Sequence, residues 1–420
     1  MNIMLPANYD LDLLPHLREH NVTEIYGKLP YDVVGGGRPS YMSTPMSRQT
    51  LTRYVAAIHR HGMAFNYLLN AACLGNQEWT RSFQRRLNKL LDWLSGIEVD
   101  TVTVVLPYLL QIVKKRYPHF KVRVGIYAQV DTVKRAQYWE ELGADGLTLE
   151  SFSINRDFEK LTRIREAVQC ELILIANHFC QPNCPFQIQH QNGFSHASGT
   201  DRRFLIDYPL LQCNYRRLRD PTRLISSGWI RPQDVHHYEA MGYHTFKLIE
   251  RNIPSEVLLK RAQAYAQRRF DGNLAELLFS WGFKRHPPRF SWLHFLRTFG
   301  PWHVRPTRYG LIKKFLQLQG IFFTFSREQL PIVIDSQAIP DDFLEHFKSD
   351  DCCDLNCAQC GYCTAVAERA VKMNPDFLAA VLPLYEEIES TLVSGDFWHL
   401  TASPTRRFGQ TIPKLERRTQ

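Results

Sequence analysis

The pattern most able to do chemistry is a cysteine run near the C-terminus, Cys353-x3-Cys357-x2-Cys360-x2-Cys363, with Cys352 adjacent. Thiolates are soft ligands that suit zinc and iron–sulfur clusters. The compact spacing favours a 4Fe–4S cluster, because ferredoxin-type segments use it, whereas structural zinc sites usually join two separated knuckles. Zinc and free redox thiols remain the alternatives. We expect Cys353 to be the fourth ligand, with Cys352 as its competitor.

A second group consists of Cys180, Cys184 and Cys213, which are loosely spaced within one long segment. Three thiols around one loop predict an open cluster site, and Cys73 is a candidate for the fourth ligand. Cys170 stands alone, and an isolated cysteine is usually a small buried hydrophobe. The sequence therefore predicts two cysteine centres, of which the one on Cys353–Cys363 would relay electrons.

Eight β-rich runs alternate with amphipathic stretches over the first 250 residues. Most runs are continuously apolar, as expected for parallel strands covered on both faces. This spacing predicts an α/β fold, a (β/α)8 TIM-type barrel, rather than an open sheet, since no GxGxxG follows the first strand. The expected strands are 2–5, 22–26, 64–69, 101–106, 121–127, 146–150, 171–176 and 245–249.

A barrel of this kind carries its chemistry at the C-terminal ends of the strands. Glu150 and His178 fall there and are candidates for proton transfer, although a salt bridge and a structural loop histidine are the plainer interpretations. Arg38 and Arg251 also fall there, and guanidinium groups pair bidentately with carboxylates of an anionic reactant. The segment 178–220 is a long insertion of the kind that usually carries function.

Three regions are expected: the barrel over 1–255, a helix and a basic, aromatic region over 256–349, and a smaller α-rich cysteine-cluster domain over 350–420. The stretch 281–325 has eight Lys and Arg, no Asp or Glu, and many aromatic residues. It suits the core of a small domain, a lipid surface or apolar substrate, or nucleic acid.

The composition, 44% hydrophobic and 22% charged, is that of a globular protein. A net charge of +9 permits an anionic partner without selecting one. No run of about 18 apolar residues is present, and the first residues have no signal-peptide pattern. We therefore expect a cytoplasmic protein, with a position peripheral to the inner face of the membrane as the alternative.

Three motifs together resemble the U32 peptidase family over residues 1–255. They are Glu171-Leu172-Ile173-Leu174-Ile175-Ala176-Asn177-His178-Phe179-Cys180, then Arg231-Pro232-Gln233-Asp234 with Phe246-Lys247-Leu248-Ile249-Glu250-Arg251, and the loop Gly35-Gly36-Gly37-Arg38. Two departures stand out. Cys180 and Cys184 are closer together than the first two cysteines of the family, and the glycine of its Glu-Gly-Arg element is missing.

The resemblance implies an iron–sulfur enzyme rather than a protease, since several U32-like proteins resemble oxygen-independent hydroxylases of ubiquinone precursors, transfer RNA or ribosomal RNA. It implies a 4Fe–4S cluster on Cys180, Cys184 and Cys213 with Cys73, and prephenate as oxygen source. It also implies an electron donor or a partner U32-like subunit. The sequence has no GxSxG or HExxH motif.

We therefore expect a hydroxylase or related redox enzyme acting on an apolar, quinone-type small molecule. The alternatives are an RNA-modifying hydroxylase, a non-catalytic electron-transfer scaffold and a U32-type peptidase.

Overall fold

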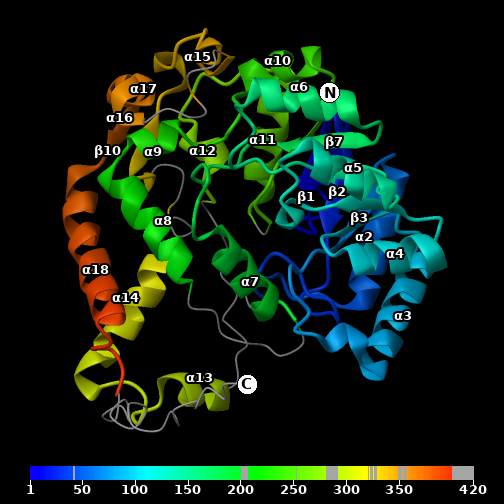
Figure 1. Ribbon diagram of the computed structural model, residues 1–420, viewed down its shortest axis with the longest axis horizontal. Coiled ribbons are helices and arrows are strands. Elements are labelled where there is room, and N and C mark those ends of the chain that lie inside the picture. Colours follow the sequence, from blue (N-terminus) through cyan, green and yellow to red (C-terminus); the bar gives the residue numbers. More distant parts are fainter. Residues whose placement is uncertain are drawn as a thin grey trace, which may run out of the picture.

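The computed structural model describes residues 1–40, 43–199, 207–251, 253–280, 292–319, 329–348 and 357–399, together with 321, 325 and 352. Its first part is a closed barrel of parallel strands in the order β1 to β8 (Figure 1). The predicted (β/α)8 barrel is confirmed, and each expected strand is present, although most end earlier than predicted. The strands are β1 (Asn2–Pro6), β2 (Val22–Gly27), β3 (Ala64–Leu69), β4 (Thr101–Val104), β5 (Lys121–Val124), β6 (Gly146–Thr148), β7 (Glu171–Ile175) and β8 (Thr245–Lys247).

Helices surround the barrel, and several begin at residues whose side chains cap the first turn. Ser47, Thr80, Thr132 and Asp157 each accept a hydrogen bond from the backbone N–H three residues later, which satisfies a donor that the helix leaves open. The barrel helices are α1 (Leu14–Leu17), α2 (Arg48–Arg60), α3 (Arg81–Gly96), α4 (Pro107–Arg116), α5 (Val133–Glu141), α6 (Phe158–Ala167), α10 (Val235–Ala240) and α11 (Ser255–Gln267). Helix α11, which the expected boundary at residue 255 places outside the barrel, packs against β1.

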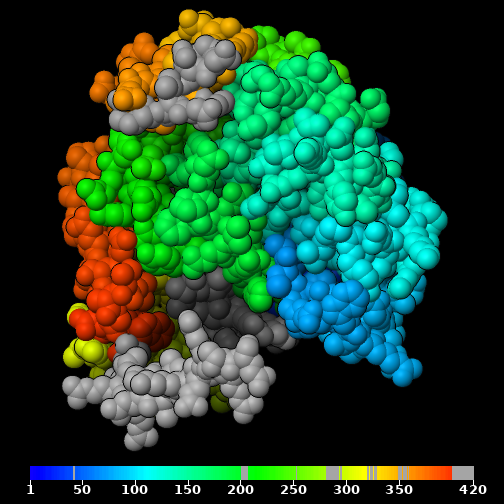
Figure 2. All heavy atoms as spheres, viewed as in Figure 1, coloured from blue at the N-terminus to red at the C-terminus, as the bar shows by residue number. Residues whose placement is uncertain are grey.

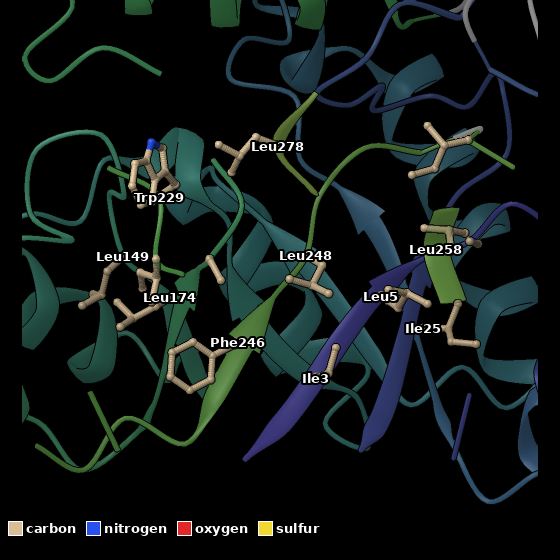
Figure 3. Close-up of a cluster of buried hydrophobic side chains, with 14 of the residues drawn as sticks. Ile3, Leu5, Ile25, Leu149, Leu174, Trp229, Phe246, Leu248, Leu258 and Leu278 are labelled. Carbon is tan, nitrogen blue, oxygen red and sulfur yellow. The ribbon is translucent and has the colours of Figure 1, made fainter. Parts of the chain in front are cut away.

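The hydrophobic core lies between the strands and these helices. Figure 3 shows Ile3 and Leu5 of β1 and Ile25 of β2 near Leu258 of α11, and all four are buried. Successive strand residues point to opposite sides, so the neighbours of these residues face the inside of the barrel. Met4, for example, joins a separate small core with residues of β2, β3 and β7.

A polar layer fills the interior of the barrel. Arg123 of β5 pairs with Glu24 of β2 and, at 2.6 Å, with Glu171 of β7. Asn66 of β3 donates to Glu24 (2.8 Å), and Thr245 of β8 donates to Glu171 (2.7 Å). Buried charge is tolerated only when it is paired and hydrogen-bonded, and this network meets both conditions.

The long insertion between β7 and β8 forms three helices at the barrel mouth, α7 (Gln187–Ala197), α8 (Tyr208–Arg219) and α9 (Thr222–Ile225). Two serines at the end of α7 fix it over the loops that follow β2 and β3. Ser198 Oγ lies 2.6 Å from the Gly36 backbone N–H, and Ser195 Oγ accepts from Ala72 N–H (2.8 Å).

The remaining helices form a smaller C-terminal part that lies along the insertion (Figures 1 and 2). Helix α18 packs on α8 and α14, and α17 packs on α9. An antiparallel pair, β9 with β10, completes this part. Its elements are α12 (Ala275–Leu278), α13 (Trp292–Phe299), α14 (Tyr309–Gln319), β9 (Ile332–Ile334), α15 (Glu345–Lys348), α16 (Cys357–Cys360), α17 (Tyr362–Ala370), β10 (Val371–Met373) and α18 (Pro375–Val393).

Of the basic, aromatic stretch 281–325, residues 281–291, 320 and 322–324 lie outside the described chain. Four apolar side chains of α14 are buried, those of Leu311, Ile312, Phe315 and Leu318, whereas that of Leu316 is exposed. Three basic groups pair with acidic residues in or just after α18: Arg305 and Arg308 with Asp396, and Lys314 with Glu387. These contacts favour the core interpretation for the described residues, while the lipid and nucleic-acid interpretations stay predictions. No helix in the described ranges has the length and apolarity needed to cross a bilayer.

One buried arginine joins the barrel to the C-terminal part. Arg231 forms a two-bond ion pair with Asp234 (2.7 and 2.8 Å) and donates to the carbonyl groups of Ile339 (3.2 Å) and Pro340 (3.0 Å). We predict that Arg231→Ala lowers the free energy of unfolding by about 3–5 kcal/mol, because Asp234 would keep a buried charge without its partner. Thermal and denaturant unfolding would measure the loss.

The matched control is Arg163→Ala, which breaks an exposed pair with Glu159 on α6. Exposed pairs contribute about 0–1 kcal/mol. Equal stability losses in the two variants would show that Arg231 has no special structural role.

Candidate functional site

A cavity of about 260 Å³ opens at the C-terminal ends of the strands, between the barrel and helices α7 and α8. Its walls combine apolar rings, thiols and basic groups. The apolar part consists of Tyr26, Leu68, Tyr127, Phe152, Ile175, Phe179, Phe186 and Phe194. A concave, mostly apolar site with a few convergent polar groups is typical of small-molecule binding.

Three cysteines from two segments line this cavity. Cys180 and Cys184 lie on the loop after β7, and Cys213 comes from α8. The pKa of Cys184 is lowered to about 6, chiefly by a hydrogen bond from Cys213. The same contact, together with burial, raises the pKa of Cys213. This arrangement brings together the three thiols that the sequence predicts to share one site.

Arg217, which the sequence analysis missed, also lines the cavity. It follows Cys213 by four residues on α8, and residues at that spacing share a helix face; this spacing was the available signal. Arg217 is buried, donates to the Phe179 carbonyl (2.8 Å), and leaves its Nε without a hydrogen-bond partner. Its positive charge acts to lower the pKa of each of the three thiols. The cavity therefore has a fixed cation beside its thiols.

His178 lies between two hydroxyl or thiol groups. Its Nδ1 is 2.8 Å from Ser151 Oγ, and its Nε2 is 3.1 Å from Cys180 Sγ. Burial lowers the pKa of His178 to about 3 and raises that of Cys180 to about 12. The pair is therefore neutral near pH 7, with the imidazole able to exchange one proton between its two neighbours.

The opposite wall is basic, and its three cations differ in their partners. Arg38 pairs with Glu250 at 2.5 Å and donates to the Arg251 carbonyl at 3.2 Å. Burial tends to raise the pKa of Glu250, but the charge and hydrogen bond of Arg38 lower it overall. Arg251 is 9% exposed and forms no ion pair with any carboxylate of the described residues. Of the two predicted arginines, Arg251 is thus the one still open to an anion.

Lys247, at the end of β8, is the third cation and was not singled out from the sequence. Its Nζ lies 4.2 Å from the ring centre of Tyr26, and burial lowers its pKa to about 8. Alternation along β8 places it beside the cavity, two residues beyond Thr245 of the polar layer.

The Gly35–Gly37 loop closes one side of this wall. Gly35 has φ +82° and donates its N–H to Asp32 (2.7 Å), and a Cβ at Gly36 would lie 2.8 Å from Asn70 Oδ1. The loop therefore needs glycine for its backbone conformation and for its close approach to β3.

Two predicted site residues lie outside the cavity lining. Glu150 accepts from the Ser153 N–H and hydroxyl (2.9 and 2.6 Å) and from Gln187 Nε2 (3.1 Å), so it fixes the loop after β6 to α7. Cys73 accepts only a local contact from Gly75 N–H (3.3 Å). Neither lines the cavity, because Glu150 is bonded to its own loop and to α7 and Cys73 to its own loop.

The second cysteine group lies on the C-terminal part. Cys353 falls outside the described residues, and no disulfide joins Cys352, Cys357, Cys360 or Cys363. Among the described residues, no set of three or more His, Cys, Asp or Glu side chains is already arranged to hold a metal ion. Each cysteine group would have to draw its thiols together on binding one.

Comparison with known proteins gives one curated relative and a set of barrel structures. The chain is 29% identical over 350 residues to an uncharacterized protease of Methanocaldococcus jannaschii, covering 83% of this chain and 89% of that protein. The structure of a U32 peptidase is 22% identical and covers 60% of this chain and 95% of its own, with a TM-score of 0.45. A phosphoribosyl anthranilate isomerase of Thermus thermophilus is 9% identical, covers 64% and 98%, and has a TM-score of 0.36. No family model matches the chain.

The similarity to the archaeal protein extends over most of both chains. The motifs noted in the sequence lie on the strands and loops that build the cavity: Gly35–Arg38 after β2, the segment up to Cys180 after β7, and the segment up to Arg251 after β8. The chain is thus a (β/α)8-barrel protein that is similar over most of its length to an uncharacterized archaeal protease.

Proposed function

We propose that the cavity is the active site of an iron–sulfur enzyme that carries out an oxygen-independent hydroxylation or related redox conversion of a small organic molecule. The observation that carries the proposal is the convergence of Cys180, Cys184 and Cys213 on one cavity beside Arg217. Thiolates bind iron–sulfur clusters, and a buried cation compensates for their negative charge. A bound cluster would supply Lewis-acid and one-electron redox chemistry.

The rest of the cavity suits a substrate with an apolar ring and an anionic co-reactant. Tyr26, Tyr127 and Phe152 provide flat apolar walls, and Arg251 provides an unpaired guanidinium. Such a group binds carboxylates bidentately, so a dicarboxylate such as prephenate is a suitable oxygen donor. His178, with Ser151 behind it, can hold or move a proton at Nε2.

The free volume beside the thiols supports an enzyme over a pure electron-transfer scaffold, which needs no substrate space. No disulfide joins the described cysteines, which suits a reducing compartment. We therefore propose a cytoplasmic location.

A thiol peptidase is the second candidate, because Cys180 and His178 are in contact and Ser151 could orient the imidazole. The thiolate is the nucleophilic form of cysteine. Burial keeps the pKa of Cys180 high and that of His178 low, so neither is in its active ionised form. The contact therefore supports a proton-transfer pair better than a nucleophile–base pair.

We predict that C180S/C184S/C213S, purified anaerobically, contains about four fewer irons per chain than the native protein, with a matching loss of acid-labile sulfide. Iron and sulfide analysis would measure this. The matched control is C170S, because Cys170 lies between α6 and β7 and does not line the cavity.

Unchanged iron in the triple variant would contradict the proposed cluster. Peptide cleavage that survives iron chelation and disappears in C180S would instead establish the peptidase.

Removal of the unpaired guanidinium should weaken anion binding. We predict that Arg251→Gln raises the Kd for prephenate about 10- to 100-fold, since a charged hydrogen bond contributes about 1.5–3 kcal/mol. Isothermal titration calorimetry would measure this. The control is Arg135→Gln, because Arg135 lies on α5 and forms an exposed ion pair with Asp131. An unchanged Kd would place anion binding elsewhere.

Anion binding should also depend on pH through Lys247. Its pKa is lowered to about 8, so the side chain is charged below that pH and neutral above it. Of the groups around it, Glu24 and Arg123 are paired, and burial raises the pKa of Tyr26 far above this range. We predict that prephenate affinity falls as pH rises from 7 to 9, and that Lys247→Met removes this dependence. A profile identical in both proteins would exclude Lys247 from the site.

A further inference from the structure

A second set of chemistry-bearing side chains lies on the C-terminal part, outside the cavity. Cys357 and Cys360 lie at either end of the single turn α16, and Cys363 follows at the start of α17 after Gly361, whose φ is +67°. The left-handed glycine reverses the chain between the two short helices. Cys363 is half-buried, and the charges of Cys357 and Cys360 act on it. Two short consecutive helices thus carry three cysteines.

An imidazole joins this turn from α15. His346 Nε2 lies 3.2 Å from Cys360 Sγ, and its ring stacks on Tyr362 with centres 4.0 Å apart. The Tyr362 hydroxyl donates to the Phe343 carbonyl (3.2 Å), which holds the stacked pair in place. The packing therefore presents a second soft donor group beside the thiols.

A buried cation from the barrel completes the surroundings. Arg156, from the loop before α6, is 7% exposed and lies over the rings of Trp229, Phe343 and Phe347 at 4.4 to 4.9 Å. It donates to two carbonyl groups, those of Ile225 (2.6 Å) and Trp229 (3.2 Å).

The Nε of this arginine has no hydrogen-bond partner, and no described carboxylate forms an ion pair with it. The thiols whose charges act on Arg156 are those of Cys363 and Cys352. A buried guanidinium is costly without a negative partner. Ionised, metal-bound thiols would provide that partner.

We propose that Cys352, Cys357, Cys360 and Cys363 bind a second iron–sulfur cluster, which Arg156 stabilises from the barrel side. The compact spacing of the last three cysteines favours this centre over zinc. Cys352 is taken as the fourth ligand because its charge, like that of Cys363, acts on Arg156. This site is independent of the cavity thiols, so it does not depend on the proposed hydroxylase function.

The test uses the full chain, purified anaerobically, with iron, zinc and acid-labile sulfide measured. In the C180S/C184S/C213S background, we expect about four irons and four sulfides per chain to remain, and C357S/C360S to remove them. The reciprocal C357S/C360S variant of the native protein should lose about four irons and keep the cavity cluster. Thermal unfolding of each variant would show that it is folded.

These variants separate the two proposals. If the native protein holds about four irons and only C357S/C360S removes them, the proposed function is overturned and the second cluster site is retained. An iron-free C180S/C184S/C213S protein, or one zinc per chain without sulfide, would overturn the second site.

Single variants test the fourth ligand and the cation. We expect C352S to lose this cluster and C353S to retain it; the reverse result would overturn the assignment of Cys352. Arg156→Gln should shift the midpoint potential of the cluster to a more negative value than Arg156→Lys does, because removal of a nearby positive charge disfavours the reduced form. Equal potentials would exclude Arg156 as its counter-charge.

Discussion

The need to balance buried positive charge governs how this molecule is built. Arginines inside the protein cannot lose their protons, so each requires a negative partner or a set of acceptors. Arg123, Arg231 and Arg38 have carboxylate partners, and these pairs hold the barrel interior, the C-terminal part and the loop after β2 in place. Arg156, Arg217 and Arg251 have no such partner among the described residues, and each lies beside thiols or the cavity.

The alternation of side chains along the strands connects the polar layer of the barrel to the cavity. On β2, Glu24 belongs to the polar layer and Tyr26 to the cavity wall, and on β8 Thr245 and Lys247 are divided in the same way. The position of the buried polar layer along the strands therefore also determines where the cavity begins. This arrangement explains why a lysine of lowered pKa lies beside Arg251 rather than in solvent.

The insertion after β7 and the C-terminal part form one helical layer over the barrel (Figure 1). Helix α8 carries Cys213 and Arg217 and packs on α18, while α9, which follows α8, packs on α17 with Cys363. Gln181, next to Cys180, donates to the Arg223 carbonyl of α9 at 3.0 Å. The two cysteine groups are thus supported by neighbouring elements of one layer, although they lie in separate surroundings.

Local pattern was sufficient for the strands, the capped helices and the grouping of the cysteines, because apolar runs, Ser, Thr and Asp caps, and close thiol spacing act over a few residues. It also placed Cys180 and Cys184 on the loop after one strand and Arg251 just after another. Tertiary packing alone decided that Glu150 and Cys73 lie outside the cavity lining. It also paired Arg38 with Glu250. The cavity-facing positions of Arg217 and Lys247 were decided in the same way. These outcomes depend on which side chains meet across loops far apart in the chain, and no local pattern encodes that.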